Sequence, residues 1–148
     1  MSVEKKYISD VETILSQRHD NGADFWATID HKLLKGAPYT TLESILYLLE
    51  LGVSPDDEVM KNAAGLIFSN WKEDGRVKTS PTGGIYPCQT ALAVNTLCHM
   101  GYSNDDRIKK SFAYFLDTQQ EDGGWKCNKY SFGRGEETEY STPYTTLV

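Results

Sequence analysis

Apolar residues recur along the middle of the chain with the spacing that helices require. Residues 39–51 and residues 89–100 carry apolar side chains on more than one side of each expected helix, which is typical of helices buried on several sides. Each is followed by a second helical stretch, residues 54–71 and residues 103–119, whose apolar positions lie on one face. The pattern therefore predicts an all-α fold in which a buried inner helix alternates with an amphipathic outer helix.

Turn residues mark where these helices begin and end. Gly52 follows the first inner helix and is a normal C-terminal stop for an α-helix. Ser54 and Ser103 are expected to be the N-caps of the outer helices, because a serine oxygen accepts a hydrogen bond from a free backbone N–H. The apolar faces expected to be buried are Val59, Ala63, Leu66 and Ile67 in the first outer helix, and Ile108, Phe112, Phe115 and Leu116 in the second.

The inner and outer helices form a sequence repeat. Residues 38–41 (Pro-Tyr-Thr-Thr) open the first copy and residues 87–90 (Pro-Cys-Gln-Thr) open the second, 49 residues later. The Glu-Asp-Gly triplets that end at Gly75 and Gly123 are 48 residues apart, so a single-residue gap aligns the copies. A third copy opens with Pro-Tyr-Thr-Thr at residues 143–146. This predicts helical hairpins of about 48–56 residues, arranged as a closing half-repeat at 1–37, repeats at 38–86 and 87–142, and the start of an inner helix at 143–148.

The end of the second outer helix carries the most specific motif. It contains a basic residue, an aromatic residue and then Gln-x-x-x-Gly-x-Trp, formed by Lys110, Tyr114, Gln119, Gly123 and Trp125. This motif resembles the glutamine–tryptophan repeat of the terpenoid cyclase and protein prenyltransferase superfamily, which includes squalene cyclase-like proteins. The resemblance implies an α/α toroid, in which inner and outer helices alternate around a central cavity. The chain is then part of an incomplete ring.

The motif is degenerate in the other copies. Trp71, Gly75 and Val77 replace it in the first full repeat, and Gln17, Gly22 and Trp26 stand at altered spacing near the N-terminus. A glutamine at a helix end bonds free backbone groups, a glycine permits the chain to reverse, and a tryptophan packs against neighbouring helices. The motif therefore indicates a structural clamp and a fold rather than a chemical reaction.

Catalytic motifs of the superfamily are missing from this sequence. Its cyclases use an Asp-x-Asp-Asp acid, whereas residues 54–57 and residues 103–106 lack the leading aspartate and recur at one repeat position, where helix capping accounts for them. Its prenyltransferases bind zinc through Asp-x-Cys and a distant histidine, and no Asp-x-Cys occurs. Cys98 and His99 are neighbours on a helix and point about 100° apart, which suits a shared zinc ion poorly. No metal or cofactor is expected, and whether the protein is an enzyme stays open.

The predicted ligand-binding residues lie near the starts of the inner helices, on the cavity side of a toroid. They are Tyr39, Tyr86, Cys88 and Tyr144. Aromatic cavities hold isoprenoid chains through apolar area and ring quadrupoles.

Two functions remain open. One is a prenyltransferase-like or terpenoid cyclase-like protein that binds an apolar, isoprenoid-type ligand. The other is a non-catalytic helical-repeat scaffold for protein or ligand binding.

Charge and composition limit the classes of partner and the cellular location that we expect. The chain has 15 basic and 21 acidic residues, a net charge of −6 and no basic cluster, which argues against a nucleic-acid partner. No apolar run is long enough to cross a membrane. Three cysteines at irregular spacing predict free thiols and a cytoplasmic location. Because a ring of this type needs more than two and a half hairpins, the sequence is expected to be a fragment that self-associates through its open end.

Overall fold

The computed structural model describes residues 3–18, 26, 29–36, 38–126, 131–132 and 136–137. Its helices are α1 (Ile8–Ser16), α2 (Thr41–Glu50), α3 (Glu58–Ser69), α4 (Pro87–Leu97) and α5 (Asp106–Thr118). A 3-10 turn, Lys5–Tyr7, precedes α1, and a wide helical turn, Cys98–Tyr102, follows α4. Two short strands, β1 (Ser131–Phe132) and β2 (Glu136–Glu137), pair antiparallel. The prediction of an all-α fold is therefore confirmed, with this strand pair as a minor addition.

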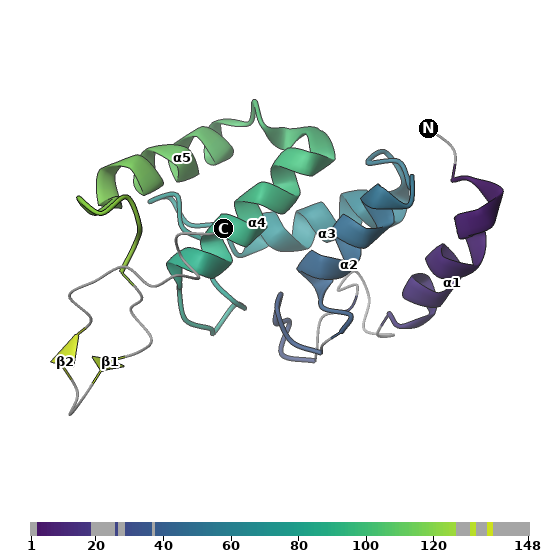
Figure 1. Cartoon of the computed structure of the whole chain (residues 1–148), viewed down its shortest axis with the longest axis horizontal. Helices are drawn as coiled ribbons and strands as arrows, with labels where there is room; N and C mark the ends of the chain where they lie inside the picture. The colour runs from purple at the N-terminus through teal and green to yellow at the C-terminus, as the bar shows by residue number, and fades with distance from the viewer. Residues whose placement is uncertain are drawn as a thin grey trace.

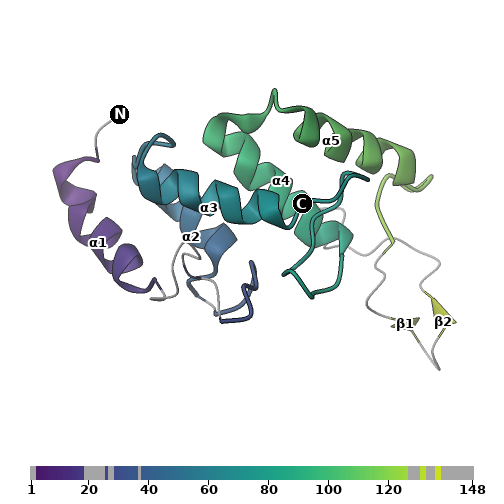
Figure 2. The ribbon, with the colours of Figure 1, turned by 180° about the vertical axis from the view of Figure 1, so that it is seen from behind.

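The helices form a row of antiparallel hairpins. Helix α1 lies at one end of the molecule, and α5 lies at the other end beside the strand pair (Figure 1). Helix α2 packs against α1, α3 and α4, and α4 packs in turn against α2 and α5. The view from behind shows the same order, with α3 crossing in front of α2 toward α4 (Figure 2). We call α2 and α3 the first unit, and α4 and α5 the second unit.

The hydrophobic core lies where the two units meet. Helix α2 contributes Leu42, Ile45 and Leu48, which are buried almost completely. The other central members of the same cluster are Met60, Ala63 and Ile67 from α3, Ala93, Val94 and Leu97 from α4, and Ile108 from α5. Each fully buried aliphatic side chain stabilises the fold by roughly 1.5–3 kcal/mol. The apolar pattern of residues 39–51 is thus explained by burial of α2 against three other helices.

Helix α2 begins and ends as its sequence predicts. The Thr40 hydroxyl accepts a hydrogen bond from the backbone N–H of Glu43 at 3.3 Å and lies 2.6 Å from the Glu43 carboxylate. The Thr40 hydroxyl therefore caps the free N–H of Glu43 and also donates a hydrogen bond to the Glu43 carboxylate. Gly52, with φ +93°, follows the last turn of the helix. Because a residue with a side chain disfavours positive φ, glycine is the natural C-terminal stop there.

The predicted N-caps of the outer helices were wrong. Asp57 and Asp105, rather than Ser54 and Ser103, precede α3 and α5. The Ser54 hydroxyl instead accepts a hydrogen bond from the N–H of Asp56 at 3.2 Å, which forms a separate turn before the helix. Serine side chains compete for backbone groups in this way. The two outer helices therefore start 48 residues apart, and the one-residue gap of the repeat falls in the turn between inner and outer helix.

Candidate functional site

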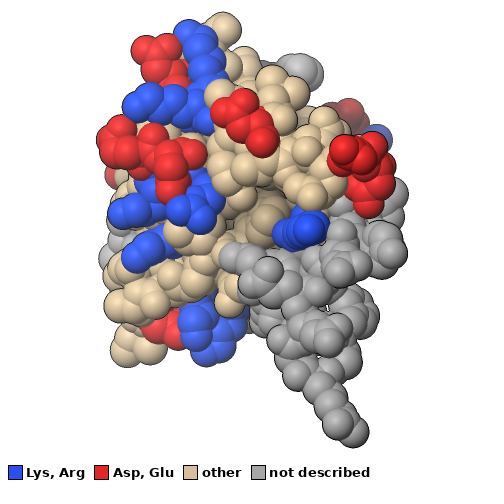
Figure 3. Space-filling model, turned by 90° about the vertical axis from the view of Figure 1, so that its left-hand side faces the viewer, with Lys and Arg blue, Asp and Glu red and all other residues tan. Residues whose placement is uncertain are grey.

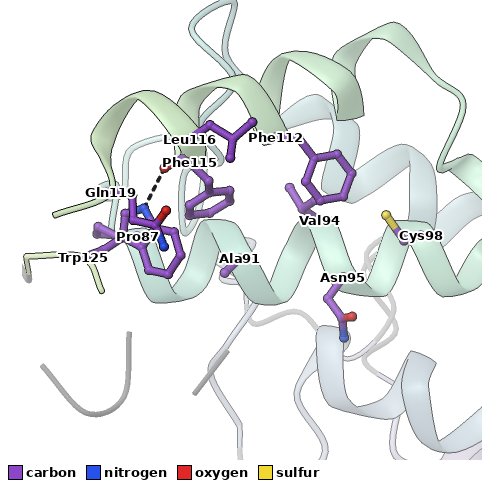
Figure 4. A pocket seen from close by; sticks show the side chains of 10 residues that line it. All are labelled: Pro87, Ala91, Val94, Asn95, Cys98, Phe112, Phe115, Leu116, Gln119 and Trp125. Atoms are coloured by element: carbon purple, nitrogen blue, oxygen red, sulfur yellow. Dashed lines mark hydrogen bonds between the residues drawn. The ribbon is translucent and has the colours of Figure 1, made fainter. Parts of the chain in front are cut away.

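An apolar groove of about 580 Å³ runs between α4 and α5 (Figure 4). Both helices of the second unit and the loop after α5 contribute to it. Its lining residues are Pro87, Ala91, Val94, Asn95 and Cys98 from the α4 side, and Phe112, Phe115, Leu116, Gln119 and Trp125 from the α5 side. None of these side chains carries a formal charge, since the Cys98 thiol is protonated. Because its lining is mainly apolar and comes from two helices, we treat the groove as the candidate site.

The α4 wall is low because its residues are small. Ala91 ends at a methyl group, and Val94 lies below the Phe112 ring in the close view (Figure 4). Cys98, at the far end of this wall, is half-buried, and burial raises the pKa of its thiol. A thiol that is kept protonated is a poor nucleophile and a poor metal ligand. Cys98 therefore contributes an apolar surface to the groove rather than chemistry.

The α5 wall is formed by large apolar side chains that remain open to solvent. Phe112 is 48% exposed and Leu116 is 74% exposed. The rings of Phe112 and Phe115 point from α5 toward α4 (Figure 4). The prediction that these residues would be buried was wrong for Phe112 and Leu116, although Ile108 of the same face is fully buried. Among the described helices, α5 packs against α4, and this contact leaves Phe112 and Leu116 of its apolar face exposed.

The glutamine–tryptophan motif closes one end of the groove. The Trp125 indole N–H donates to the Phe115 carbonyl at 2.9 Å, and the two rings meet edge to face with centroids 5.6 Å apart. The Gln119 side-chain amide donates to the Gly123 carbonyl at 2.7 Å. Gly123 has φ +84°, a conformation that glycine adopts without strain. The motif therefore ties the loop back onto α5 and places Trp125 beside the groove.

The tryptophans of the other two copies make one matching contact and one different contact. The Trp26 indole N–H donates to the Ile14 carbonyl of α1 at 2.8 Å, and Trp26 is completely buried. This bond matches the one from Trp125 to α5, although the spacing differs in sequence. In the first unit, the Trp71 indole N–H reaches across to the Ser111 hydroxyl of α5 at 3.2 Å. The degenerate motif of the first unit thus joins one hairpin to the next.

Two motif residues lie on the opposite side of α5 from the groove. The Lys110 ammonium lies 3.0 Å from the Glu73 carboxylate and 5.6 Å from the centre of the Trp71 ring. Tyr114 is half-buried next to Phe115, with ring centroids 5.3 Å apart. Lys110 therefore contacts the first unit, whereas Gln119 and Trp125 face the groove.

The structure places the predicted ligand-binding residues apart from one another. Tyr39 lines a shallow pocket with Ile14 and Tyr47, and Tyr86 lines a different pocket near Gln89. Cys88 is half-buried in the first turn of α4. Tyr144 lies outside the described residues. The groove was missed because its apolar residues were assigned to the core. The signal that could have found it is the bulk of Phe112 and Leu116 on the last predicted outer helix.

Charged side chains lie beside the groove and not within it. In the view of the α5 end of the molecule, many charged side chains gather along one edge, and a basic side chain lies next to a hollow in the uncharged surface (Figure 3). Asp105, the N-cap of α5, forms hydrogen bonds with the Arg107 guanidinium at 2.7 and 2.9 Å. These bonds lower the pKa of Asp105 to about 2. The Arg107 guanidinium also lies 3.5 Å from the centre of the Phe68 ring, so this ion pair links α5 to α3.

This arrangement does not suit the acid of a cyclase. A residue that protonates an alkene must hold its proton near neutral pH, whereas Asp105 is ionised because Arg107 stabilises its charge. No group of three or more histidine, cysteine, aspartate or glutamate residues suitable for a metal ion occurs among the described residues. His19 and Cys127, which have side chains of metal-binding types, lie outside the described residues. The side chains that line the groove itself are uncharged and mainly apolar.

Comparison with known proteins adds no relative. Neither the protein-family models nor the curated proteins compared with this sequence match it. Within the part of the chain that the structure describes, no helix has the length and apolar composition needed to cross a bilayer.

Proposed function

We propose that the protein is a helical-repeat scaffold that binds a partner through the groove between α4 and α5. The observation that carries this proposal is the contiguous, uncharged lining of the groove, which includes Phe112 and Leu116 at 48% and 74% exposure. Single exposed apolar residues are common, but a contiguous apolar hollow on a folded domain indicates an interaction site. Binding of an apolar partner is favoured because the side chains that line the groove are uncharged.

An α/α toroid is the architecture we propose for the complete array. The support is that α2 and α4 pack side by side as inner helices, while α3 and α5 each return along the outside of its own hairpin. The bond from Trp26 to α1 adds a closing half-hairpin at the N-terminal end. Repeats of this kind continue by adding one hairpin after another.

An isoprenoid-type ligand is the second candidate for the groove. Phe112, Phe115 and Trp125 bring three aromatic rings to one apolar hollow. Its volume of about 580 Å³ lies within the range of pockets that hold small apolar molecules. A cyclase-like or prenyltransferase-like role would use these rings to hold the ligand.

A fluorescent dye that binds apolar surfaces, anilinonaphthalene sulfonate, tests the proposal. We expect the wild-type chain to enhance its fluorescence, and the double variant Phe112→Ser/Leu116→Ser to lose most of that enhancement. Ile8→Ser is the matched control, because Ile8 is 44% exposed but lies on α1, away from the groove. Equal enhancement by all three proteins would refute the groove as the binding site. Displacement of the dye by micromolar farnesol would favour the isoprenoid ligand over a protein partner.

A further inference from the structure

We propose that the groove between α4 and α5 is the docking face for one more helical hairpin of this same repeat. This inference rests on the proposed scaffold function and names its partner. It follows from comparing the two units, whose outer helices are related by a shift of 48 residues. The first unit shows what a completed docking face looks like, and the second unit shows the same face uncovered.

Equivalent positions differ in burial between the units. Ala64 of α3 is 1% exposed, whereas Phe112, at the same position of α5, is 48% exposed. Val77 in the loop after α3 is buried, whereas its counterpart Trp125 is only half-buried. Ile67 and Phe115 form a third such pair, fully buried in the first unit and half-buried in the second. Both units therefore carry this apolar face, but it is buried in the first unit and partly exposed in the second.

The next hairpin provides the cover of the first unit. From the inner helix α4, the Thr90 hydroxyl accepts a hydrogen bond from the N–H of Val77 at 3.2 Å and lies 3.4 Å from the Val77 carbonyl. From the outer helix α5, Ser111 accepts the bond from Trp71 at 3.2 Å. Both Thr90 and Ser111 are completely buried by these contacts. The second unit thus docks on the first through two of its own residues. One is a threonine near the start of its inner helix, and the other is a small residue on its outer helix.

The turn glycines of the two units also differ in whether a following helix packs over them. A Cβ atom added at Gly75 would lie 2.5 Å from the Lys110 carbonyl oxygen, because the backbone of α5 passes directly over this turn. At Gly123, the counterpart in the second unit, an added Cβ would meet no described atom within 4 Å. The second unit therefore carries the glycine that the close approach of a following outer helix requires, but nothing described approaches it.

The sequence indicates what kind of segment fits over the groove. The docking threonine Thr90 belongs to the Pro-x-x-Thr that opens an inner helix, and Thr41 holds the same position, completely buried, at the start of α2. A third Pro-x-x-Thr occurs at residues 143–146. We therefore assign the groove to a hairpin whose inner helix starts with this motif. Such a hairpin would place apolar side chains over Phe112 and Leu116 and its outer helix over Gly123.

The experiment extends the full chain by one copy of its own first unit. Residues 143–147 are identical to residues 38–42, so residues 43–86 are added after Leu147 to continue the repeat. Amide hydrogen exchange in α5 is measured in the original and extended chains. We expect exchange in α5 to slow by roughly tenfold or more in the extended chain, and anilinonaphthalene sulfonate binding to the groove to be lost.

A substitution shows whether the slowing arises at the groove. Phe112→Lys should leave α5 exchange nearly unchanged in the original chain but should remove the slowing in the extended chain. Ile8→Lys, at a similarly exposed site on α1, should leave the slowing intact. Unchanged α5 exchange on extension, or an added segment that gains no helix by circular dichroism, would overturn the assignment. If the dye never binds the original groove, the scaffold proposal itself fails; if it binds but extension has no effect, only the hairpin assignment fails.

Discussion

At the scale of single residues, two turn glycines share one backbone conformation but differ in how closely other residues pack against them. Gly75 and Gly123 have φ of +87° and +84°, so both turns need a left-handed residue. The Glu-Asp-Gly triplets in the sequence predict both turns. Only the structure shows that Gly75 also lies against the backbone of α5, because that contact joins residues far apart in the chain.

Alanine substitutions should separate these two effects. We expect Gly123→Ala to lower the free energy of unfolding by about 1 kcal/mol, the cost of a left-handed conformation for a residue with a side chain. Gly75→Ala should cost about 1–3 kcal/mol more, because the added methyl group meets the Lys110 carbonyl. Urea denaturation of both variants measures the difference. Equal losses would show that the contact of Gly75 with α5 is absent in solution.

Asp105 should make stability depend on pH in the acidic range. Its pKa is lowered to about 2 by hydrogen bonds to Arg107, so its stabilising contribution is complete above about pH 4–5 and disappears as pH falls through about 2. Asp105→Asn keeps a capping side chain but removes the charge. Because Arg107 is 42% exposed, we expect a loss of only about 0.5–1 kcal/mol at pH 7. Chemical denaturation at pH 7 and pH 2 should show this loss and then its disappearance.

At the scale of elements, α5 combines a covered face with an open one. Ile108 and Ser111 are completely buried against the first unit, while Phe112 and Leu116 border the groove. The apolar periodicity of residues 103–119 correctly predicts an amphipathic helix, but it does not distinguish these two faces. Periodicity reports which residues prefer to leave water, and the neighbouring elements decide which of them can do so.

Truncation of single side chains should reveal the two faces of α5. Ile108→Ala should lower the free energy of unfolding by about 2–4 kcal/mol, because it leaves a cavity in the core. Phe112→Ala should change it by less than about 0.5 kcal/mol, as is usual at an open surface. Thermal and urea unfolding provide the measurement. A large loss for Phe112→Ala would mean that the chain already covers the groove.

At the scale of the whole molecule, the described helices pack mainly against those of the neighbouring hairpin. Helix α1 packs on α2, and α5 packs on α4 and on the loop after α3. In repeat arrays of this kind, stability is transmitted from one unit to the next. We expect Ile14→Ala, in the buried face of α1, to speed amide exchange in α1 and α2 more than in α5. Equal acceleration in all helices would indicate a single cooperative unit instead.

The sequence alone determined the all-α class, the alternation of inner and outer helices, and the turns at Gly52, Gly75 and Gly123. These features depend on local periodicity and backbone preference, which neighbouring residues encode directly. The tertiary structure decided that Asp57 and Asp105 cap the outer helices and that Phe112 and Leu116 stay open beside α4. Capping is a competition between nearby polar groups, and burial depends on which helix arrives from elsewhere in the chain. Neither can be read from one helix, because both are properties of its surroundings.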